Sequence, residues 1–430
     1  MQINLFPRLI VLLIGLVLLI AACTAIDSPG SEATTPTTSI EAEATTADPE
    51  QLGAGTSTAT AEALPTAVAE DILAPTLLPP EAPPPGIERE FSTDFSRHTI
   101  AYDEILSGGP PKDGIPAVDD PQFVSTAEAD TWLDDLEPVT VFQEAGDVRI
   151  YPFQILTWHE IVNDIVGGRP VAVTFCPLCN TAIIFDATVN GQPLDFGTTG
   201  RLRYSNLLMY DRQTESWWQQ ASGEAVIGEL AGERLTFLPA TIISWAEARA
   251  EYPEAQVLSR ETGFSRNYGR NPYAGYDNIN SSPFLFRGPA TPDQLPAMAR
   301  VTTVELNGEA VAYPNDVLQE VGVVNDTVDG VEVAVFWQPG LASALDSSSI
   351  ADGQDVGASG VFERTLNGRA LTFTTNGETI TDEETGSTWN ILGQATAGEL
   401  AGQTLKPVVK VDHFWFSWAA FRPDTRIYQP

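Results

Sequence analysis

Apolar and polar positions alternate along most of the chain beyond its N-terminal region, in short runs typical of half-buried β-strands. Examples are TAIIFDATV (181–189), PLDFGTT (193–199) and RLTFL (234–238), and an Asn190-Gly191 turn separates the first two. Asn-Gly is the preferred loop of a tight β-hairpin, because both residues tolerate a left-handed backbone. The pattern therefore predicts a β-rich fold.

Two helical segments interrupt the strands. Thr157 and Glu160 have the spacing of a capping box, which predicts the start of a short helix after the dipeptide Tyr151-Pro152. The segment SWAEARAEYP (244–253) predicts a second helix that closes the same unit. Helices and strands together give the fold class α+β.

The chain also resembles itself. VRIYPFQILTWHEIVNDIVGGRPVAVTFCPLCN (148–180) is similar to AVAYPNDVLQEVGVVNDTVDGVEVAVFWQPGLA (310–342), and YDRQTESWWQQASGEAVIGELAGERL (210–235) is similar to TDEETGSTWNILGQATAGELAGQTL (381–405). Such similarity predicts an internally duplicated unit, with the two copies packed together. The second copy lacks the cysteines of the first, so we expect the function to lie in the first copy.

The N-terminus has the pattern of a bacterial lipoprotein signal. Arg8 precedes an uninterrupted apolar run at 9–20, which ends in small residues before Cys23. In such a signal the cysteine carries lipid and begins the mature chain, so we expect a membrane anchor through Cys23. The alternative is an uncleaved membrane anchor, although the run is short for a span. Both place the protein outside the cytoplasm, anchored to the membrane at the cell surface or in the periplasm.

A tether rich in Thr, Ala, Pro and Glu follows, without Lys or Arg from Thr24 to Glu88. Such a composition buries too little apolar surface to order the chain, so this stretch is expected to be disordered. The formal net charge of the whole chain is −36. This charge argues against nucleic acid and anionic lipid surfaces as partners, and leaves the identity of a protein or small-molecule partner open.

These patterns divide the chain into five parts. They are a lipoprotein-type signal peptide at 1–22, a disordered tether at 23–90, a first copy carrying the cysteines at 91–262, a connecting segment at 263–300, and a second, degenerate copy at 301–430.

Cys176 and Cys179 form a C-x-x-C pair in the first copy, and the chain has one other cysteine, Cys23. The β-branched and aromatic segment NTAIIFD follows the pair, so we expect it on a strand–turn–strand and not at a helix start as in thioredoxins. This context is typical of a metal-binding knuckle. Asn180 occupies the position where such a turn needs a left-handed residue, which Asn tolerates.

A tetrahedral metal site needs four ligands, and one C-x-x-C pair supplies two. His159, at the start of the first predicted helix, and His413, from the second copy, are the histidines expected to complete it. Thiolate and imidazole ligands together suit a zinc or copper ion. The leading hypothesis is therefore a metal-binding site made of the two cysteines and histidine, with redox chemistry as a further option.

Two other functions stay open. Cys176 and Cys179 can cycle as a thiol–disulfide oxidoreductase, or they can form a structural disulfide in a non-catalytic binding or scaffold lipoprotein. The chain has no G-x-S-x-G motif, Walker loop, dinucleotide fingerprint or H-E-x-x-H motif. Whether the protein is an enzyme is left open.

Five further residues are weaker candidates for a site. Lys112 and Asp113 stand in a stiff Gly/Pro loop, and Asn206, Asp211 and Arg212 lie between aromatic residues. A loop stiffened around a rare lysine can line a site, but it is equally consistent with a simple turn.

Five ordered motifs resemble a bacterial family of exported proteins known as domain of unknown function 3179. They are GPPKDGIPAVDDPQF (109–123), YPFQILTWHEIVND (151–164), VTFCPLCNTA (173–182), LMYDRQTESWWQ (208–219) and HFWFSW (413–418). The resemblance covers about residues 90–430. It implies no activity, substrate or cofactor, and adds that the motifs containing both histidines and both cysteines occur together as a set.

Overall fold

The computed structural model describes residues 76–430. The predicted signal peptide at 1–22, the lipid-bearing Cys23 and most of the predicted tether lie outside the described residues. Within that range, no helix is both long and apolar enough to cross a membrane. Ile87 and Phe91 are already buried in an apolar cluster.

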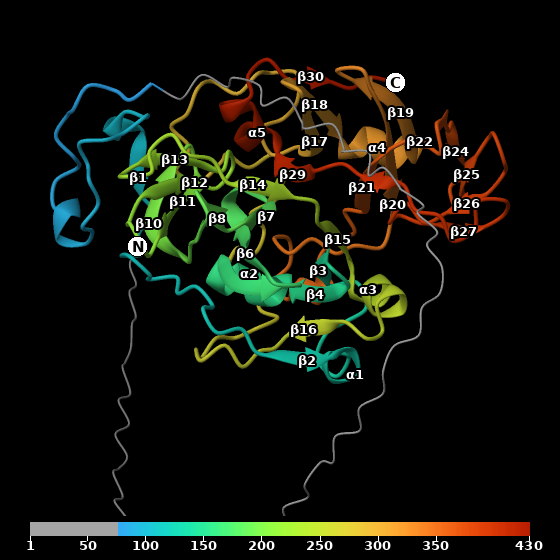
Figure 1. Cartoon of the computed structure of the whole chain (residues 1–430), viewed down its shortest axis with the longest axis horizontal. Helices are drawn as coiled ribbons and strands as arrows, with labels where there is room; N and C mark the ends of the chain where they lie inside the picture. The colour runs from blue at the N-terminus through green and yellow to red at the C-terminus, as the bar shows by residue number, and fades with distance from the viewer. Residues whose placement is uncertain (1–75) are drawn as a thin grey trace, which may run out of the picture. The chain divides into compact units, whose positions relative to one another are not determined.

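The described chain is β-rich with few helices, as predicted (Figure 1). For reference, residues 76–299 are called the first half and residues 300–430 the second half. The helices are α1 (Thr126–Ala129), α2 (Phe153–His159), α3 (Trp245–Glu251), α4 (Asn315–Val321) and α5 (Trp415–Phe421). Short 3-10 helices are η1 (Ile87–Arg89), η2 (Tyr102–Glu104), η3 (Pro177–Cys179) and η4 (Ile350–Asp352).

Three sheets form most of the first half. One has the order β15 (Thr241–Ser244), β3 (Pro138–Glu144), β4 (Asp147–Pro152), β16 (Gln256–Leu258) and β2 (Phe123–Ser125). The next has the order β14 (Thr236–Leu238), β7 (Thr181–Asp186), β6 (Arg169–Cys176) and β5 (Ile161–Val166). The third has the order β1 (Ile105–Ser107), β10 (Phe196–Arg203), β11 (Asn206–Asp211), β12 (Trp217–Gln219) and β13 (Glu224–Ile227).

Three larger sheets likewise form the second half. The first has the order β29 (Lys410–Phe414), β17 (Arg300–Leu306), β18 (Glu309–Pro314) and β30 (Arg426–Ile427). The second has the order β19 (Val323–Val328), β20 (Val331–Gln338), β21 (Ala358–Glu363) and β28 (Lys406–Pro407). The third has the order β24 (Phe373–Thr375), β25 (Ile380–Asp382), β26 (Thr388–Trp389) and β27 (Ala395–Ala397). Two-stranded ribbons join β8 (Thr188–Val189) with β9 (Gln192–Pro193), and β22 (Thr365–Leu366) with β23 (Arg369–Ala370).

The predicted position of the first helix is wrong. Helix α2 begins at Phe153, directly after Pro152, and ends at His159. Glu160 follows it in a left-handed conformation, with φ 58°, and therefore ends the helix instead of capping its start. The β-branched run from Ile161 to Val166 pairs with β6, because such residues fit a pleated strand better than a helix.

The second predicted helix is confirmed. Ser244 is the N-cap of α3, and its side chain and that of Glu247 form a reciprocal capping box. This cap satisfies two backbone amides that a free helix end leaves without partners. The helix ends after Glu251, close to the predicted boundary.

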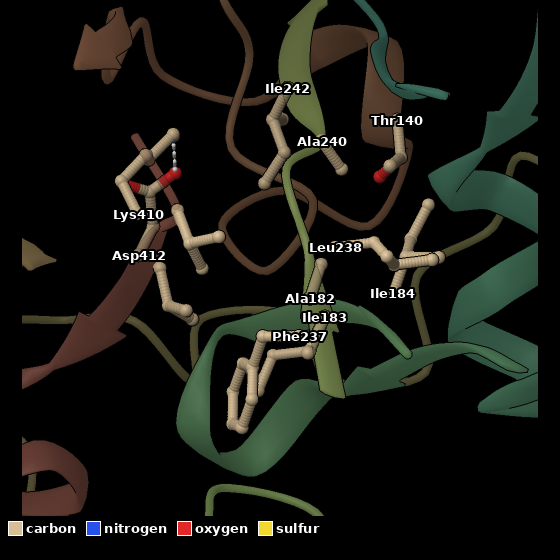
Figure 2. A pocket seen from close by; sticks show the side chains of 12 residues that line it. Thr140, Ala182, Ile183, Ile184, Phe237, Leu238, Ala240, Ile242, Lys410 and Asp412 are labelled. Atoms are coloured by element: carbon tan, nitrogen blue, oxygen red, sulfur yellow. Dashed lines mark hydrogen bonds and ion pairs between the residues drawn. The ribbon is translucent and has the colours of Figure 1, made fainter. Parts of the chain in front are cut away.

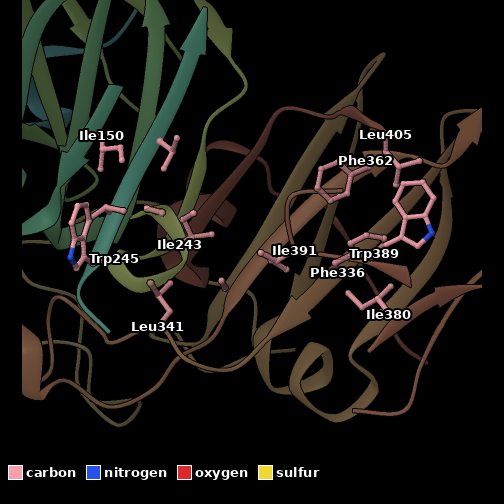
Figure 3. Packing of buried hydrophobic residues seen from close by; sticks show 14 of the residues in the cluster. Ile150, Ile243, Trp245, Phe336, Leu341, Phe362, Ile380, Trp389, Ile391 and Leu405 are labelled. Atoms are coloured by element: carbon pink, nitrogen blue, oxygen red, sulfur yellow. The ribbon is translucent and has the colours of Figure 1, made fainter. Parts of the chain in front are cut away.

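One apolar core spans both halves. In Figure 3, Ile150 and Trp245 of the first half lie on one side of this cluster, and Phe336 and Trp389 of the second half on the other. Burying apolar surface contributes about 25 cal/mol per Å², so the shared core stabilises the two halves as one unit. Their residues can therefore contribute to one site.

Strand β29 connects the second half to the sheet that bears the cysteines, because it contacts β7 of that sheet as well as its own neighbour β17. Figure 2 shows the pocket between them, lined by Ile184, Leu238 and Ile242 on one side and by Lys410 and Asp412 on the other. Lys410 Nζ and Asp412 Oδ2 form an ion pair of 2.5 Å beside it. The cavity holds about 10 Å³, so the seam is closely packed.

Candidate functional site

Cys176 and Cys179 lie on a tight turn between two antiparallel strands. Cys176 ends β6 and pairs with Thr181, the first residue of β7. Pro177 starts the intervening 3-10 turn, and Asn180 ends it in a left-handed conformation with φ 53°. The predicted strand–turn–strand, and the left-handed role of Asn180, are both confirmed.

The two thiols are free and buried. Their relative exposures are 2% for Cys176 and 0% for Cys179. The carbonyl oxygen of Ser205 lies 3.9 Å from Cys176 Sγ and 3.5 Å from Cys179 Sγ. One backbone acceptor therefore faces both sulfurs, and either thiol can donate to it while protonated.

The surroundings make the two thiols unequal. Burial, and donation of its hydrogen bond to Cys179, raise the pKa of Cys176 well above the usual value. Burial also acts to raise the pKa of Cys179, but its polar neighbours Cys176, Ser417 and Asn206 outweigh it and lower that pKa. The Ser417 hydroxyl is buried and has no partner with hydrogen-bond geometry, so Asn206 is the clearest donor to Cys179 Sγ. The two thiols are therefore inequivalent, and Cys179 is the one whose surroundings favour a thiolate.

A network of buried amides orients the donor to Cys179. Asn206 Nδ2 lies 3.4 Å from Cys179 Sγ and 2.9 Å from Gln220 Oε1. Gln220 Nε2 in turn donates to Thr174 Oγ1 at 3.0 Å and to the carbonyl of Thr181 at 3.1 Å. Asn206, predicted as a weaker candidate, is thus brought to the cysteines. Satisfied buried networks of this kind hold one geometry.

The loop that brings Ser205 to the sulfurs has a strained backbone. Tyr204 and Ser205 are the two loop residues between β10 and β11, with φ 53° and 67°. A hairpin loop with both residues left-handed favours Asn-Gly. Non-glycine residues held there cost on the order of 1–3 kcal/mol each and are common at functional sites.

A buried carboxyl lies next to the pair. Glu160 directly follows α2, and its backbone carbonyl accepts from the amide of Phe175, the residue before Cys176. Its side chain accepts from Tyr273 Oη at 3.4 Å. Burial raises the pKa of Glu160 to about 8, and the hydrogen bond from Tyr273 offsets this only in part.

His159 lies at the end of α2 and not at its start. Its Nδ1 is 2.7 Å from the carbonyl oxygen of Pro116, and its Nε2 is 2.7 Å from Tyr268 Oη. Burial lowers the pKa of His159, with a hydrogen bond to Pro116 acting against it and Arg266 acting with it. The neutral imidazole is therefore favoured by burial, and the predicted position of His159 at a helix start is wrong.

His413 lies on β29, directly before α5, as predicted from the sequence. Its Nδ1 is 2.8 Å from Oγ1 of Thr181, which in turn donates to the carbonyl of Cys179 at 3.1 Å. Its ring lies 5.1 Å from that of Trp418, and its Nε2 is buried without a partner. Burial lowers the pKa of His413 to about 3, so it is neutral.

Within residues 76–430, no three His, Cys, Asp or Glu side chains are grouped so as to hold a metal ion. Both ring nitrogens of His159 already have oxygen partners. The unpartnered Nε2 of His413 is the nitrogen that fits a metal best. The two thiols and His413 are thus not grouped as three ligands in this structure, and a metal site made of them would need a rearrangement.

Four other candidate residues make structural contacts away from the cysteines. Lys112 Nζ pairs with Glu215 at 2.5 Å and lies 4.5 Å from the ring centre of Tyr210. Asp113 accepts from Tyr210 Oη at 2.5 Å. Arg212 pairs with Asp119 at 2.9 Å. The remaining candidate, Asp211, accepts from Trp218 Nε1 at 2.9 Å and caps the following turn.

Sequence reasoning missed Ser417, Gln220 and Tyr276. Tyr276 Oη donates to the carbonyl of Leu178, between the two cysteines, at 2.9 Å. These residues are distant in sequence from the cysteine turn and have no spacing signal of their own. The aromatic run HFWFSW, which contains Ser417, was the available signal, because its polar residues lie among buried rings.

Comparison with known proteins gives one match. A family model described as "Protein of unknown function (DUF3179)" matches residues 112–425. No curated protein and no solved structure matches the chain.

Proposed function

Since the chain belongs to the DUF3179 family, whose function is unknown, we propose a function from its own site: it is a thiol–disulfide oxidoreductase that uses Cys176 and Cys179. The observation that carries the proposal is the inequality of two adjacent free thiols. Asn206 Nδ2 lies 3.4 Å from Cys179 Sγ and helps to lower the pKa of that thiol, whereas burial holds the pKa of Cys176 well above its usual value. The thiolate is the nucleophile in thiol–disulfide exchange.

The exchange needs two substitutions at sulfur. The Cys179 thiolate attacks one sulfur of a substrate disulfide, the substrate S–S bond breaks, and one substrate thiolate leaves. Cys176 then loses its proton and attacks Cys179 Sγ, which releases the second substrate thiolate. The substrate disulfide gains two electrons, and the protein pair becomes a disulfide. The reverse sequence oxidises a substrate dithiol.

Asn206 and Ser417 have distinct roles in these steps. The hydrogen bond from Asn206 and the nearby Ser417 hydroxyl favour the charged form of Cys179 before the attack. Cys176 is within hydrogen-bond reach of Cys179, so it is placed to attack a mixed disulfide formed there. Hydrogen bonds to a charged group are about twice as strong as neutral ones.

Trapping the intermediate tests the proposal. A Cys176→Ser protein, incubated with oxidised glutathione, is expected to retain one glutathione on Cys179, because no second thiol resolves it. The Cys179→Ser protein is the matched control and is expected to react far more slowly. Intact-protein mass spectrometry reads both. Equal and negligible labelling of both variants would contradict an oxidoreductase and favour a structural role.

A zinc or copper site is the second candidate, and the buried unpartnered Nε2 of His413 supports it. Cys176, Cys179 and His413 would hold the ion. His159 could join only after losing its bonds to Pro116 and Tyr268. Elemental analysis after reconstitution tests this: about one equivalent of metal, lost in a His413→Ala variant, supports the site, and under one-tenth of an equivalent contradicts it.

We also infer that the two halves derive from one duplicated unit. Equivalent buried contacts support this: Tyr151 donates to Asp164 at 2.7 Å, and Tyr313 donates to Asp326 at 2.9 Å. Asn163 and Asn325 each bond both backbone groups of a phenylalanine in a neighbouring strand. The first copy alone keeps the thiols, as proposed from the sequence.

The site is proposed to act outside the cytoplasm, on a protein anchored to the membrane through lipid at Cys23. The support is the apolar run at 9–20 with its small-residue exit. A Cys23→Ser variant is expected to leave the membrane fraction, which cell fractionation with an antibody detects. Retention of this variant in the membrane would favour an uncleaved anchor.

A further inference from the structure

A segment without helix or strand contacts the turn that carries the buried thiols. This segment joins β16 to β17 across residues 259–299, and it supplies Tyr276, which bonds the carbonyl of Leu178 in the cysteine turn. Part of it, residues 278–291, is here called the tip. A covered thiol pair cannot react with a disulfide, because the attacking sulfur must reach it in line.

The tip is fixed at both ends. On one side Asp277, with its side chain 1% exposed, pairs with Arg300 at 2.8 Å and accepts from Ser343 Oγ at 2.5 Å. On the other side the carbonyl of Pro292 accepts from Trp415 Nε1 at 3.0 Å. These anchors define two hinge points in the connecting segment.

Between its anchors the tip is held weakly. Among the described residues, two hydrogen bonds join it to residues outside it: Ser205 Oγ donates to the carbonyl of Phe284 at 2.5 Å, and the amide of Phe284 donates to Tyr276 Oη at 3.3 Å. The Phe286 ring also packs 5.1 Å from that of Phe416. Segments with few buried contacts open locally at low free-energy cost.

The tip also exposes apolar side chains and stores backbone strain. Ile279 is 47% exposed and Phe284 is 52% exposed. Leu285 has a φ of 52°, which is unfavourable for a side chain with a β-carbon. Opening of the tip would release this strain. The free energy that favours the closed tip is therefore smaller than its contacts alone would give.

Ser205 connects the tip to the thiols. Its hydroxyl holds the Phe284 carbonyl, while its own carbonyl faces both sulfurs. We propose that residues 278–291 form a lid over the cysteine pair, latched by the Ser205 hydroxyl, and that the thiols become reactive when this lid opens. As a means of regulating exchange the lid rests on the proposed function, but thiol access can be measured without it.

Alkylation of the native protein by N-ethylmaleimide tests the lid. Ser205→Ala removes the latch and keeps the backbone carbonyl, so alkylation of the cysteine pair is expected to become about five- to tenfold faster, the effect of losing one hydrogen bond. Phe286→Leu, which weakens packing on Phe416, is expected to act in the same direction. The control is Ser387→Ala, which removes a buried hydroxyl that accepts from the amide of Leu400 in the second half.

The urea dependence of alkylation separates lid opening from unfolding. Local opening exposes little surface, so the rate is expected to rise with urea much less steeply than the global unfolding constant. A rate that follows global unfolding, or an equal acceleration in Ser387→Ala, would overturn the lid. Wild-type thiols that react as fast as free cysteine would overturn it too. Failure of glutathione exchange with a confirmed lid would instead count against the oxidoreductase alone.

Discussion

Asn206 is the residue that most directly separates a reactive thiol from an inert one. Its amide donates to Cys179 Sγ at 3.4 Å. Asn206→Ala is expected to raise the pKa of Cys179 and to destabilise the fold by about 1–3 kcal/mol, since buried partners lose a bond. The pH dependence of thiolate absorbance measures the first effect, and urea unfolding the second.

The control for Asn206 is Asn325→Ala in the second half. Asn325 is also hydrogen bonded to its surroundings, through both backbone groups of Phe373. The Asn325→Ala substitution is expected to lower the free energy of unfolding without changing the pKa of Cys179. The proposed role of Asn206 is wrong if both variants leave the pKa of Cys179 unchanged.

Glu160 gives the fold a specific pH dependence. Its pKa is about 8 in the folded chain, against an ordinary value of 4.5. Between these values the folded protein holds a proton that the unfolded chain has released, so stability falls as pH rises through this window. The slope contributed by one such group approaches about 1.4 kcal/mol per pH unit.

Glu160→Gln is therefore expected to flatten the stability profile between pH 4.5 and 8, measured by urea unfolding at a series of pH values. Glu137→Gln is the matched comparison, because burial raises the pKa of Glu137 to about 7 in a different part of the core. Glu137→Gln is expected to change the pH dependence of stability only up to about pH 7, the pKa of Glu137 in the folded chain. A Glu160→Gln profile identical to wild type would mean that the carboxyl is not buried in solution.

At the level of elements, the sequence predicted correctly those elements whose backbone is set by residues within the same short segment. The C-x-x-C turn was predictable because Pro177 and Asn180 set its backbone directly. Helix α2 was misplaced because a capping-box spacing competed with the β-branched run that follows it. Pairing with β6 decided that competition, and such pairing depends on residues that local sequence does not reveal.

The hairpins after β11 and β25 show why Asp211 was a misleading candidate. Asp211 accepts from Thr214 and Trp218, and Asp382 accepts from Thr385 and Trp389 in the same way. Asp211→Ala and Asp382→Ala are each expected to cost about 2–4 kcal/mol, because several buried donors lose their acceptor.

Neither aspartate variant is expected to change the exchange rate of the cysteine pair with oxidised glutathione. Unfolding in urea gives the stability, and mass spectrometry of the trapped pair gives the rate. A selective loss of exchange in Asp211→Ala, with Asp382→Ala unaffected, would instead return Asp211 to the site.

At the scale of the whole molecule, the site is built from segments that lie far apart in the sequence. Cys176 and Cys179 come from the first half, Ser417 and His413 from the second, and Tyr276 from the segment between them. The role of His413 near the cysteine turn was foreseeable, because a polar ring among buried aromatics needs a partner. The proposed lid at residues 278–291 was not foreseeable, since its residues have no periodic pattern.

We expect the folded protein to cycle between a dithiol and a disulfide at Cys176 and Cys179. The most direct measurement is a titration in glutathione redox buffers, with acid trapping, alkylation and mass spectrometry of the native protein. We expect a reversible two-electron transition at a potential above about −300 mV, the value below which structural disulfides typically lie. A pair that stays reduced in the most oxidising buffer, or that resists reduction while the protein is folded, would contradict it.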